Sequence, residues 1–359
     1  MIEMILREAV DRRASDIHIE PIGDGGQIRL RIDGSLQVSH ELAKDDLQFL
    51  ISQLKVRARM DIAEKRIPQD GSFRSRIAGE IMDIRVSSLP TIEGEKLVLR
   101  LLNYQPFFKS LSDLGMDGQT EGHLRRLIRR PHGMIIVTGP AGSGKTTTMY
   151  AMLQELYQTG NDKNITTLED PVEYRIKGFN QVEINPRSGL TFSVGLRSIL
   201  RQDPNIIMLG EMRDMESTEM AIRVALTGHL IFTTLHTSDT IGAIFRLLDM
   251  GIPAYMITSA VTGVLAQRLI RKVCLFCASK QDKAGCPYCK GTGYYGRIGV
   301  FELLVMRPEL SEMIIRRASM DEIRKEAAKH GWVSLRQQME AKLMRGETAQ
   351  TVTEEWLDG

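Results

Sequence analysis

The chain has 359 residues, of which 42% are hydrophobic and 26% charged, and its formal net charge at pH 7 is +2. This composition is typical of a globular protein, the length favours two domains over one, and the near-neutral charge gives no sign of direct nucleic-acid binding. No apolar stretch approaches the roughly 20 residues that span a bilayer, and the N-terminus does not fit a signal peptide. We therefore expect a cytoplasmic protein that meets a membrane only through a partner or at its surface.

Residues 1–102 predict an α+β domain. Their apolar residues recur first with helical spacing and then in alternation with polar ones. In chain order the predicted segments are a helix, a strand, a hairpin, a helix and a pair of strands, at residues 2–10, 17–19, 28–38, 47–60 and 82–102. Residues 103–116 contain proline, serine and glycine and are predicted to form a linker.

The pattern changes from residue 117, where helical segments alternate with short apolar runs. The four runs lie at residues 134–137, 165–168, 206–209 and 230–235. This alternation predicts a mostly parallel sheet covered by helices, and hence an α/β domain over residues 117–359. The segment after residue 300 is predicted to be helical, and Ser319 and Glu322 fit a capping box.

A glycine-rich stretch follows the first apolar run and fits the G-x-x-x-x-G-K-[ST] pattern of phosphate-binding loops. Backbone N–H groups and the start of a helix would bind phosphates there. Lys145 would reach the β- and γ-phosphates, and the Thr146 hydroxyl would bind Mg²⁺. A surface turn with a solvated lysine is the weaker interpretation, because a strand precedes the loop and a helical pattern follows it. The predicted nucleotide-binding residues are Gly139, Pro140, Ala141, Gly142, Ser143, Gly144, Lys145, Thr146 and Thr147.

Two acids directly follow the next apolar runs. Glu169 comes after residues 165–168, and Glu211 comes shortly after residues 206–209. The carboxyl ends of parallel strands share one edge of a sheet, where ligands bind. Phosphoryl transfer to water needs carboxylates that orient the water and hold Mg²⁺. Either acid alone is as well explained by a solvated loop, but both together with the glycine-rich loop predict a catalytic site.

Two arginines and two histidines leave alternatives open. Arg197 and Arg201 are four residues apart and share a helix face, where they would neutralise phosphate charge or simply pair with acids. His229 and His236 flank the last apolar run and would sense the γ-phosphate or cap a loop. The residues alone do not decide between these interpretations.

The four cysteines form two C-x-x-C pairs separated by eight residues. Two such pairs predict a closed tetrahedral Zn²⁺ site, which has no open position for water and is therefore structural. Free thiols are the alternative. The predicted zinc ligands, within a small subdomain at residues 271–296, are Cys274, Cys277, Cys286 and Cys289.

Together these features resemble the secretion ATPases of type II secretion and type IV pilus assembly. The resemblance extends over nearly the whole chain. Its marks are two stretches in the leading domain, the Walker A loop, an acidic box, an atypical Walker B segment and a histidine box, at residues 13–21, 85–91, 139–146, 167–173, 203–214 and 227–237.

The resemblance implies a homohexameric ring of two-domain subunits, with ATP and Mg²⁺ between an N-terminal domain, PAS-like in the family, and a RecA-like core. It implies that Glu169 and Glu211 are the catalytic and Mg²⁺-linked glutamates. Four arginines match residues that gather round the phosphates, namely Arg85, Arg100, Arg197 and Arg201.

Many family members carry an extra N-terminal domain, whereas this chain begins at the two-domain core. It is similar in this to the competence-pseudopilus assembly ATPase of Gram-positive bacteria and to pilus-retraction ATPases, and the four cysteines favour the assembly branch. The resemblance implies a motor, peripheral to the cytoplasmic face of the membrane, that acts through a polytopic platform protein to assemble a type IV pilus, competence pseudopilus or type II secretion pseudopilus. A retraction ATPase, a nucleic-acid translocase on the same core and a nucleotide-gated scaffold are the alternatives.

Overall fold

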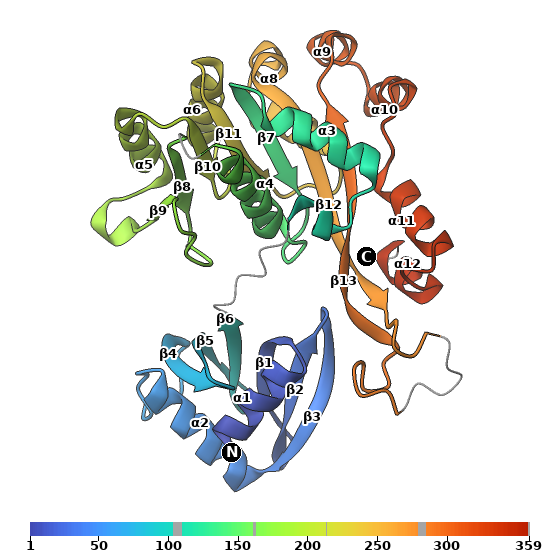
Figure 1. Cartoon of the computed structure of the whole chain (residues 1–359). Helices are drawn as coiled ribbons and strands as arrows, with labels where there is room; N and C mark the ends of the chain where they lie inside the picture. Colours follow the sequence, from blue (N-terminus) through green and yellow to red (C-terminus); the bar gives the residue numbers. More distant parts are fainter. Residues whose placement is uncertain (103–109, 161–162, 213, 279–284, 358–359) are drawn as a thin grey trace. The chain divides into compact units, whose positions relative to one another are not determined.

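The chain divides into two compact units, Met1–Phe107 and Phe108–Gly359, each with its own hydrophobic core (Figure 1). The computed structural model describes residues 1–102, 110–160, 163–212, 214–278 and 285–357. The first half of the predicted linker, residues 103–109, therefore lies outside the described residues, and its described half contains the short 3₁₀ helix η1 (Leu111–Leu114). None of the described helices combines the length and apolar character that a membrane-spanning segment needs.

The first unit is a six-stranded antiparallel sheet with two helices packed on one face (Figure 1). The strand order is β3-β2-β1-β6-β5-β4. Alternate strand residues reach the core, so on β1 Ile17 and Ile19 are buried there while Asp16 and Glu20 belong to the opposite, polar face. The elements are α1 (Ile2–Asp11), β1 (Ala14–Ile22), β2 (Gly25–Ile32), β3 (Ser35–Ala43), α2 (Lys44–Arg57), β4 (Gln69–Ile77), β5 (Glu80–Thr91) and β6 (Gly94–Leu102).

The second unit is built on a seven-stranded sheet of order β13-β12-β7-β11-β10-β8-β9. All neighbours in it are parallel except the β12–β13 pair. Its strands are β7 (Gly133–Thr138), β8 (Ile165–Glu169), β9 (Asn180–Glu183), β10 (Ile206–Leu209), β11 (Leu230–Leu235), β12 (Val261–Val273) and β13 (Tyr294–Val305). The mixed α/β fold predicted from the sequence is confirmed.

Helices cover both faces of this sheet (Figure 1). They are α3 (Gly118–Ile128), α4 (Lys145–Thr159), α5 (Phe192–Ile199), α6 (Met215–Leu226), α7 (Thr240–Asp249), α8 (Ala254–Ala260), α9 (Pro308–Ile315), α10 (Met320–Lys329), α11 (Leu335–Met344) and α12 (Gln350–Leu357), with 3₁₀ turns η2 (Pro186–Ser188) and η3 (Leu200–Gln202).

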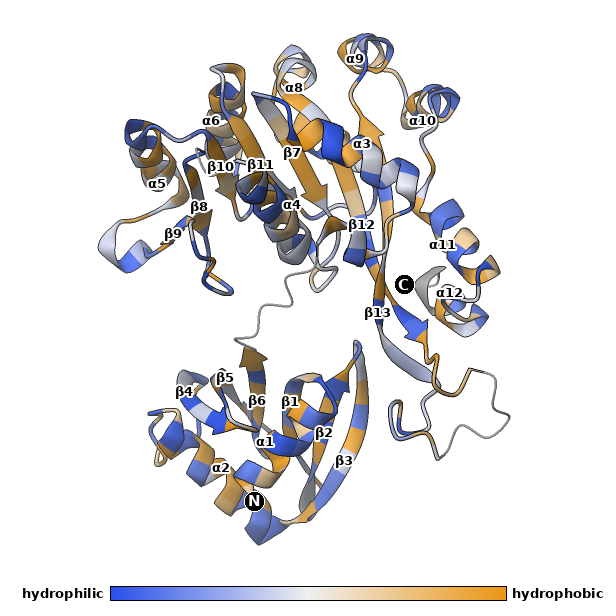
Figure 2. Cartoon of the chain, in the orientation of Figure 1, coloured by the Kyte–Doolittle hydropathy of each residue, from blue (hydrophilic) through white to orange (hydrophobic). Residues whose placement is uncertain are grey.

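The central strands β7 and β11 are buried along their whole length and mostly apolar, because both of their faces are covered (Figure 2). Successive residues of β7 join different cores. Met134 and Ile136 pack with α6 and α8, whereas Ile135 and Val137 pack with α3 and α4. This double burial produces the continuous apolar runs that the sequence displays.

The structure also corrects some expectations. The segment after residue 300 begins as a strand, since β13 extends to Val305 before α9–α12 follow. Strands β4, β9 and β12 were not predicted; β4 and β9 are edge strands with largely polar sequences, whereas β12 is a central strand. The predicted capping box is confirmed, with Ser319 and Glu322 bonded reciprocally at the start of α10.

Candidate functional site

The glycine-rich stretch forms a turn between β7 and α4. Gly144 is the N-cap of α4, with φ of 87°, a left-handed conformation that glycine adopts without strain. A Cβ at Gly139 would lie 2.4 Å from the carbonyl oxygen of Gln267 on β12. Both positions therefore require glycine, and the turn presents the positive end of α4, as phosphate binding needs.

Lys145 is held against the turn that precedes it. Its Nζ donates hydrogen bonds to the carbonyl oxygens of Gly139, at 2.8 Å, and Pro140, at 2.9 Å. Burial lowers the pKa of Lys145, and the charge of Glu211 opposes that shift. The ammonium group of Lys145 is thus bonded to neutral carbonyl oxygens and lies near the carboxylate of Glu211. Charged phosphate oxygens would form stronger hydrogen bonds with it than these carbonyls do.

Other groups of the loop also suit an anion and its cation. Ser143 is buried, and its Oγ has no hydrogen-bond partner within the described part of the chain. A buried hydroxyl of this kind calls for a partner. Thr146 and Thr147 lie half-buried at the start of α4. The residues therefore fit a phosphate chain, with the Thr146 hydroxyl available to Mg²⁺.

Glu211 is the acid that the structure places near Lys145, the lysine of the phosphate-binding loop (residues 139–146, called the P-loop below). It follows β10, which is separated from β7 by β11 alone. Its Oε2 lies 3.3 Å from Nε2 of His236, the residue after β11. The charge of Glu211 also raises the pKa of Lys145, so these two residues lie close together. Lys145, Glu211 and His236 therefore share one edge of the sheet. Arg213, in the predicted Walker B segment, lies outside the described residues.

Glu169 ends β8 but is enclosed, with 2% of its surface exposed. Its Oε1 accepts hydrogen bonds from the Thr167 hydroxyl at 2.5 Å and from Gln181 Nε2 at 3.3 Å, and its Oε2 accepts one from the Tyr150 hydroxyl. Burial raises the pKa of Glu169, against the effect of these hydrogen bonds. The two predicted catalytic acids therefore occupy different environments.

His229 lies at the other end of β11 from His236. Leu235 of β11 stands opposite Thr138 of β7, after which the P-loop begins. The carbonyl of His229 instead accepts a hydrogen bond from Gly133, at the start of β7. A strand of this length separates the two histidines by about 20 Å. Within its own unit, His229 is thus not brought to the P-loop.

The paired arginines of the second unit are both exposed. Arg197, on α5, has Nη2 at 3.1 Å from Oε1 of Glu216. Arg201, in η3, donates hydrogen bonds to the Arg197 carbonyl at 3.0 Å and to Ser198 Oγ at 3.2 Å. In the structure Arg197 therefore pairs with an acid, and both guanidinium groups remain at the surface.

The arginines of the first unit line a groove of about 590 Å³ together with Asp70 and Ser87. Arg85 and Arg100 stand directly opposite each other on β5 and β6. Like charges in this arrangement repel unless a negative group lies nearby. Asp16 supplies one such group, with Oδ1 at 3.1 Å from Arg100 Nε. The exposed remainder of this surface suits a further anion.

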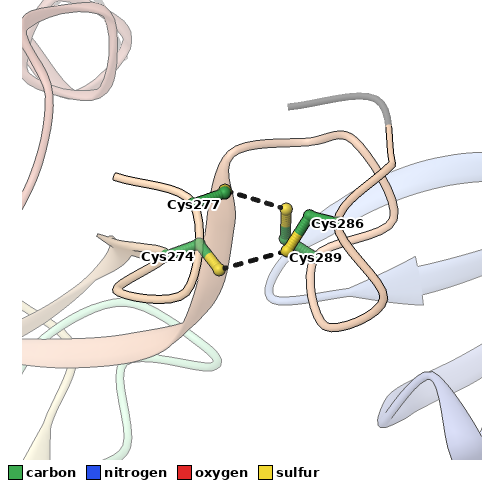
Figure 3. Close-up of side chains that lie close together, drawn as sticks. All are labelled: Cys274, Cys277, Cys286 and Cys289. Carbon is green, nitrogen blue, oxygen red and sulfur yellow. Dashed lines mark hydrogen bonds between the residues drawn. The ribbon is translucent and has the colours of Figure 1, made fainter. Parts of the chain in front are cut away.

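The four cysteines are gathered in the connection between β12 and β13 (Figure 3). Their sulfur atoms all lie within 4.8 Å of one another. Sγ of Cys274 is 3.9 Å from that of Cys286, and Sγ of Cys277 is 3.6 Å from that of Cys289. A tetrahedral zinc site with Zn–S bonds of about 2.3 Å needs sulfurs about 3.8 Å apart, whereas a disulfide needs about 2.05 Å. The spacing of the four sulfur atoms therefore fits Zn²⁺.

Part of the predicted zinc subdomain, residues 279–284, lies outside the described residues. The described part contains an aromatic cluster next to the cysteines. The rings of Phe276 and Tyr288 are stacked with centroids 3.5 Å apart, and Tyr295 meets both edge-on. This packing links the two C-x-x-C turns independently of a metal.

Several side chains of the site carry no sequence signal of their own. Gln267 is 1% exposed and accepts a hydrogen bond at 2.7 Å from Thr148 on α4, so β12 supports the P-loop helix. Thr167 is two residues before Glu169 on β8, so the two side chains lie on the same face of the strand. This spacing is the one sequence feature that predicts a hydrogen-bond donor to Glu169. Tyr150 and Gln181 reach Glu169 from distant segments, which no local pattern indicates.

Comparisons with known proteins agree over nearly the whole chain. The family model described as "Type II/IV secretion system protein" matches residues 1–357. The type II secretion system protein HxcR of Pseudomonas aeruginosa is 45% identical over 352 residues, which cover 97% of this chain and 75% of HxcR. The type IV pilus assembly ATPase PilB of Myxococcus xanthus is 41% identical over an alignment of 376 positions, gaps included, which covers 97% of this chain and 66% of PilB.

The chain is also similar in structure to the pilus retraction motor PilT, whose crystal structure contains bound ADP. The superposition covers 99% of this chain and 96% of the PilT chain. Its TM-score is 0.66 and its sequence identity 26%. This similarity confirms the RecA-like P-loop fold that the sequence predicted. The chain belongs to the type II/IV secretion system protein family.

Proposed function

We propose that the chain is an ATPase motor that hydrolyses ATP, with Mg²⁺, to assemble a type IV pilus, a competence pseudopilus or a type II secretion pseudopilus. The observation that carries this proposal is Lys145 held within a P-loop turn, with Glu211 acting on it from the same sheet edge. A helix N-terminus and a lysine bind phosphates, and carboxylates supply the Mg²⁺ and water contacts of hydrolysis. The names of HxcR and PilB support a secretion or pilus motor over other P-loop enzymes.

All but one of the predicted catalytic residues have a role at the site in this proposal. Lys145 binds the β- and γ-phosphates, and Thr146 binds Mg²⁺. Glu211 holds Mg²⁺ and its waters, Glu169 orients and deprotonates the attacking water, and His236 contacts Glu211 near the γ-phosphate. The phosphate charge is neutralised by the four arginines Arg85, Arg100, Arg197 and Arg201. His229 has no role at the P-loop of its own unit.

The motor works as a homohexamer on the cytoplasmic face of the membrane, through a polytopic platform protein. Its functional domains are residues 1–102 and 117–359, joined by residues 103–116. The four arginines proposed to bind phosphate are exposed on their own units, and a guanidinium that binds phosphate must be accessible to it. Zn²⁺ bound by the four cysteines is structural.

Steady-state phosphate release tests the enzymatic part of the proposal. We expect Mg²⁺-dependent turnover that Lys145→Ala lowers by at least about 100-fold, because one charged group at the transferring phosphoryl is lost. Lys177→Ala, at an exposed position outside the site, is the control and should leave turnover unchanged. Binding of ATP without turnover would instead favour a nucleotide-gated scaffold, and strong stimulation by single-stranded DNA a translocase.

The direction of the motor is tested in the cell. Deleting the gene should abolish extruded fibres, because assembly loses its energy source. A retraction ATPase gives the opposite phenotype, since its loss leaves fibres that accumulate. Electron microscopy of surface fibres in the deletion strain and in the strain carrying Lys145→Ala distinguishes the two.

A further inference from the structure

The surroundings of Glu169 contain a donor that the proposed roles do not use. Tyr150 lies on α4, five residues after Lys145, and is 1% exposed. Its hydroxyl donates to Oε2 of Glu169, while Thr167 and Gln181 donate to Oε1. The three donors come from α4, β8 and β9, so the carboxylate is held from three separate elements (Figure 1).

The three donors occupy most of the positions at which the Glu169 carboxylate can accept a hydrogen bond. A carboxylate offers about four lone-pair sites, two on each oxygen. Thr167 and Gln181 fill the two sites of Oε1, and Tyr150 fills one site of Oε2. Counting the donors from the described residues, one site remains, on the oxygen that Tyr150 binds. A further donor, such as a water molecule, is accepted there in a direction that the phenol determines.

We infer that Tyr150 is a positioning residue for ATP hydrolysis, which orients Glu169 so that the remaining site on Oε2 accepts the proton of the attacking water. This inference rests on the proposed function. In the step it serves, the water oxygen forms a bond to the γ-phosphorus and the bond from phosphorus to the bridging oxygen breaks. ADP keeps that electron pair, and the proton of the water passes to Glu169.

The phenol is itself fixed in place. Its ring meets Tyr174 edge-on, with centroids 4.6 Å apart and an interplanar angle of 81°. α4 therefore carries both Lys145, at its first residue, and the hydroxyl that holds the carboxylate. The helix that begins at the glycine-rich loop thus also holds Glu169 through Tyr150, so one rigid element connects the loop to the proposed base.

The electrostatics agree with this geometry. Burial raises the pKa of Tyr150, so the phenol stays protonated and remains a donor throughout the physiological range. The pKa of Glu169 is raised by burial and by the charge of Glu173, and it is lowered by its three hydrogen bonds. The hydroxyl therefore favours the ionised carboxylate, which is the form that accepts a proton.

The test is Tyr150→Phe in the full-length protein, assayed for kcat and KM. The substitution keeps the ring that packs on Tyr174 and removes only the hydroxyl. We expect kcat to fall about 10- to 100-fold, the range for loss of a hydrogen bond to a charged group, with KM and the affinity for a fluorescent ADP analogue unchanged. The acid limb of the kcat–pH profile should also move to higher pH, because Glu169 loses a bond that lowers its pKa.

Tyr157→Phe is the matched control. Tyr157 lies on the same helix, and its ring meets Phe179 edge-on with centroids 5.9 Å apart. This variant should retain the kcat and KM of the wild type. In a Glu169→Gln background, Tyr150→Phe should cause no further loss of residual turnover, because it acts only through Glu169.

Three results would overturn the inference: an unchanged kcat in Tyr150→Phe, an equal loss in the Glu169→Gln background, or a loss confined to KM. If Tyr150→Phe does not fold, Gln181→Met loosens the same carboxylate from the edge strand β9, and it must lower kcat at unchanged KM. Absence of turnover in the wild type would refute the proposed function itself. Full turnover in Glu169→Gln would refute the role of Glu169, and neither outcome resembles failure of Tyr150 alone.

Discussion

At the scale of single residues, two glutamates end nearby strands but meet different surroundings. Glu211 is partly exposed beside Lys145 and His236. Glu169 is enclosed, and burial raises its pKa. An accessible carboxylate beside the P-loop lysine suits Mg²⁺, whereas a raised pKa makes a carboxylate a better proton acceptor. This contrast supports the assignment of the two acids to different tasks.

Replacing Glu169 by Gln should leave ATP bound but lower kcat by about 10²–10⁴-fold, the usual loss when a general base is removed. In the wild type, kcat should fall as the pH drops through the raised pKa of Glu169, since the protonated acid no longer accepts a proton. That acid limb should therefore lie above the normal carboxyl range, and it should be absent from the residual rate of the variant. Measurements of kcat against pH check both points.

Matched variants separate the two acids. Glu211→Gln should increase the Mg²⁺ concentration needed for half-maximal turnover, which Glu169→Gln should not change. Glu219→Gln, which alters an exposed pair with Arg223 on α6, should behave as the wild type. Undiminished turnover in Glu169→Gln would remove that residue from the mechanism.

At the scale of secondary structure, the sequence predicted β7, β8, β10 and β11, whose apolar runs are buried, but it missed the central strand β12, whose first half is equally buried. The edge strands β4 and β9 were missed because their strand character comes from pairing with β5 and β8 rather than from their own residues. The order of strands and loops sufficed to place Glu169 and Glu211 at strand ends. Their unequal burial depends on Tyr150 and Gln181, which the fold brings from distant segments.

The connection between β12 and β13 provides a prediction at this scale. Four thiolates this close repel one another without a cation, so metal binding and local folding should be coupled. We expect about one zinc per chain in protein purified without chelator. Cys274→Ser with Cys277→Ser should lose the metal and increase amide hydrogen exchange in residues 271–296, while the rest of the second unit stays protected.

The hydrogen-exchange map also supplies the control for that experiment. Ser188 lies in the turn η2, outside the connection that contains the cysteines. The Ser188→Ala variant should therefore bind zinc and show the same hydrogen exchange as the wild type. Metal analysis that finds no zinc in the wild type would contradict the predicted site. Global unfolding of the double variant would show that the connection between β12 and β13 also stabilises the rest of the second unit.

At the scale of the whole molecule, candidate phosphate-binding arginines lie on both units. Arginine suits this task because its fork of donors matches a phosphate edge and its charge does not titrate. We expect turnover per chain to rise with protein concentration as rings assemble. Arg100→Ala should weaken hydrolysis more than ATP binding, by up to the roughly 10³–10⁵-fold that an arginine finger contributes.

Phosphate release across a dilution series, with light scattering to record the assembled fraction, tests this expectation. Arg7→Ala removes an exposed arginine from α1 in the same unit and serves as the charge-matched control. Its turnover should follow the wild type at every concentration. Full per-chain activity in demonstrably monomeric protein would refute the ring-dependent site.

The central place of β7 has a consequence for how the chain is made. β7 precedes the other strands of its sheet in the sequence, yet it lies between β11 and β12. Hydrogen bonds join Thr138 to Leu235, 97 residues later, and Met134 to Thr262, 128 residues later. At roughly 5–20 residues per second, the ribosome therefore delivers the second neighbour about 6–25 s after β7 itself. The glycine-rich loop before α4 packs against Gln267 of β12, so its surroundings are complete only after that late strand has been synthesised.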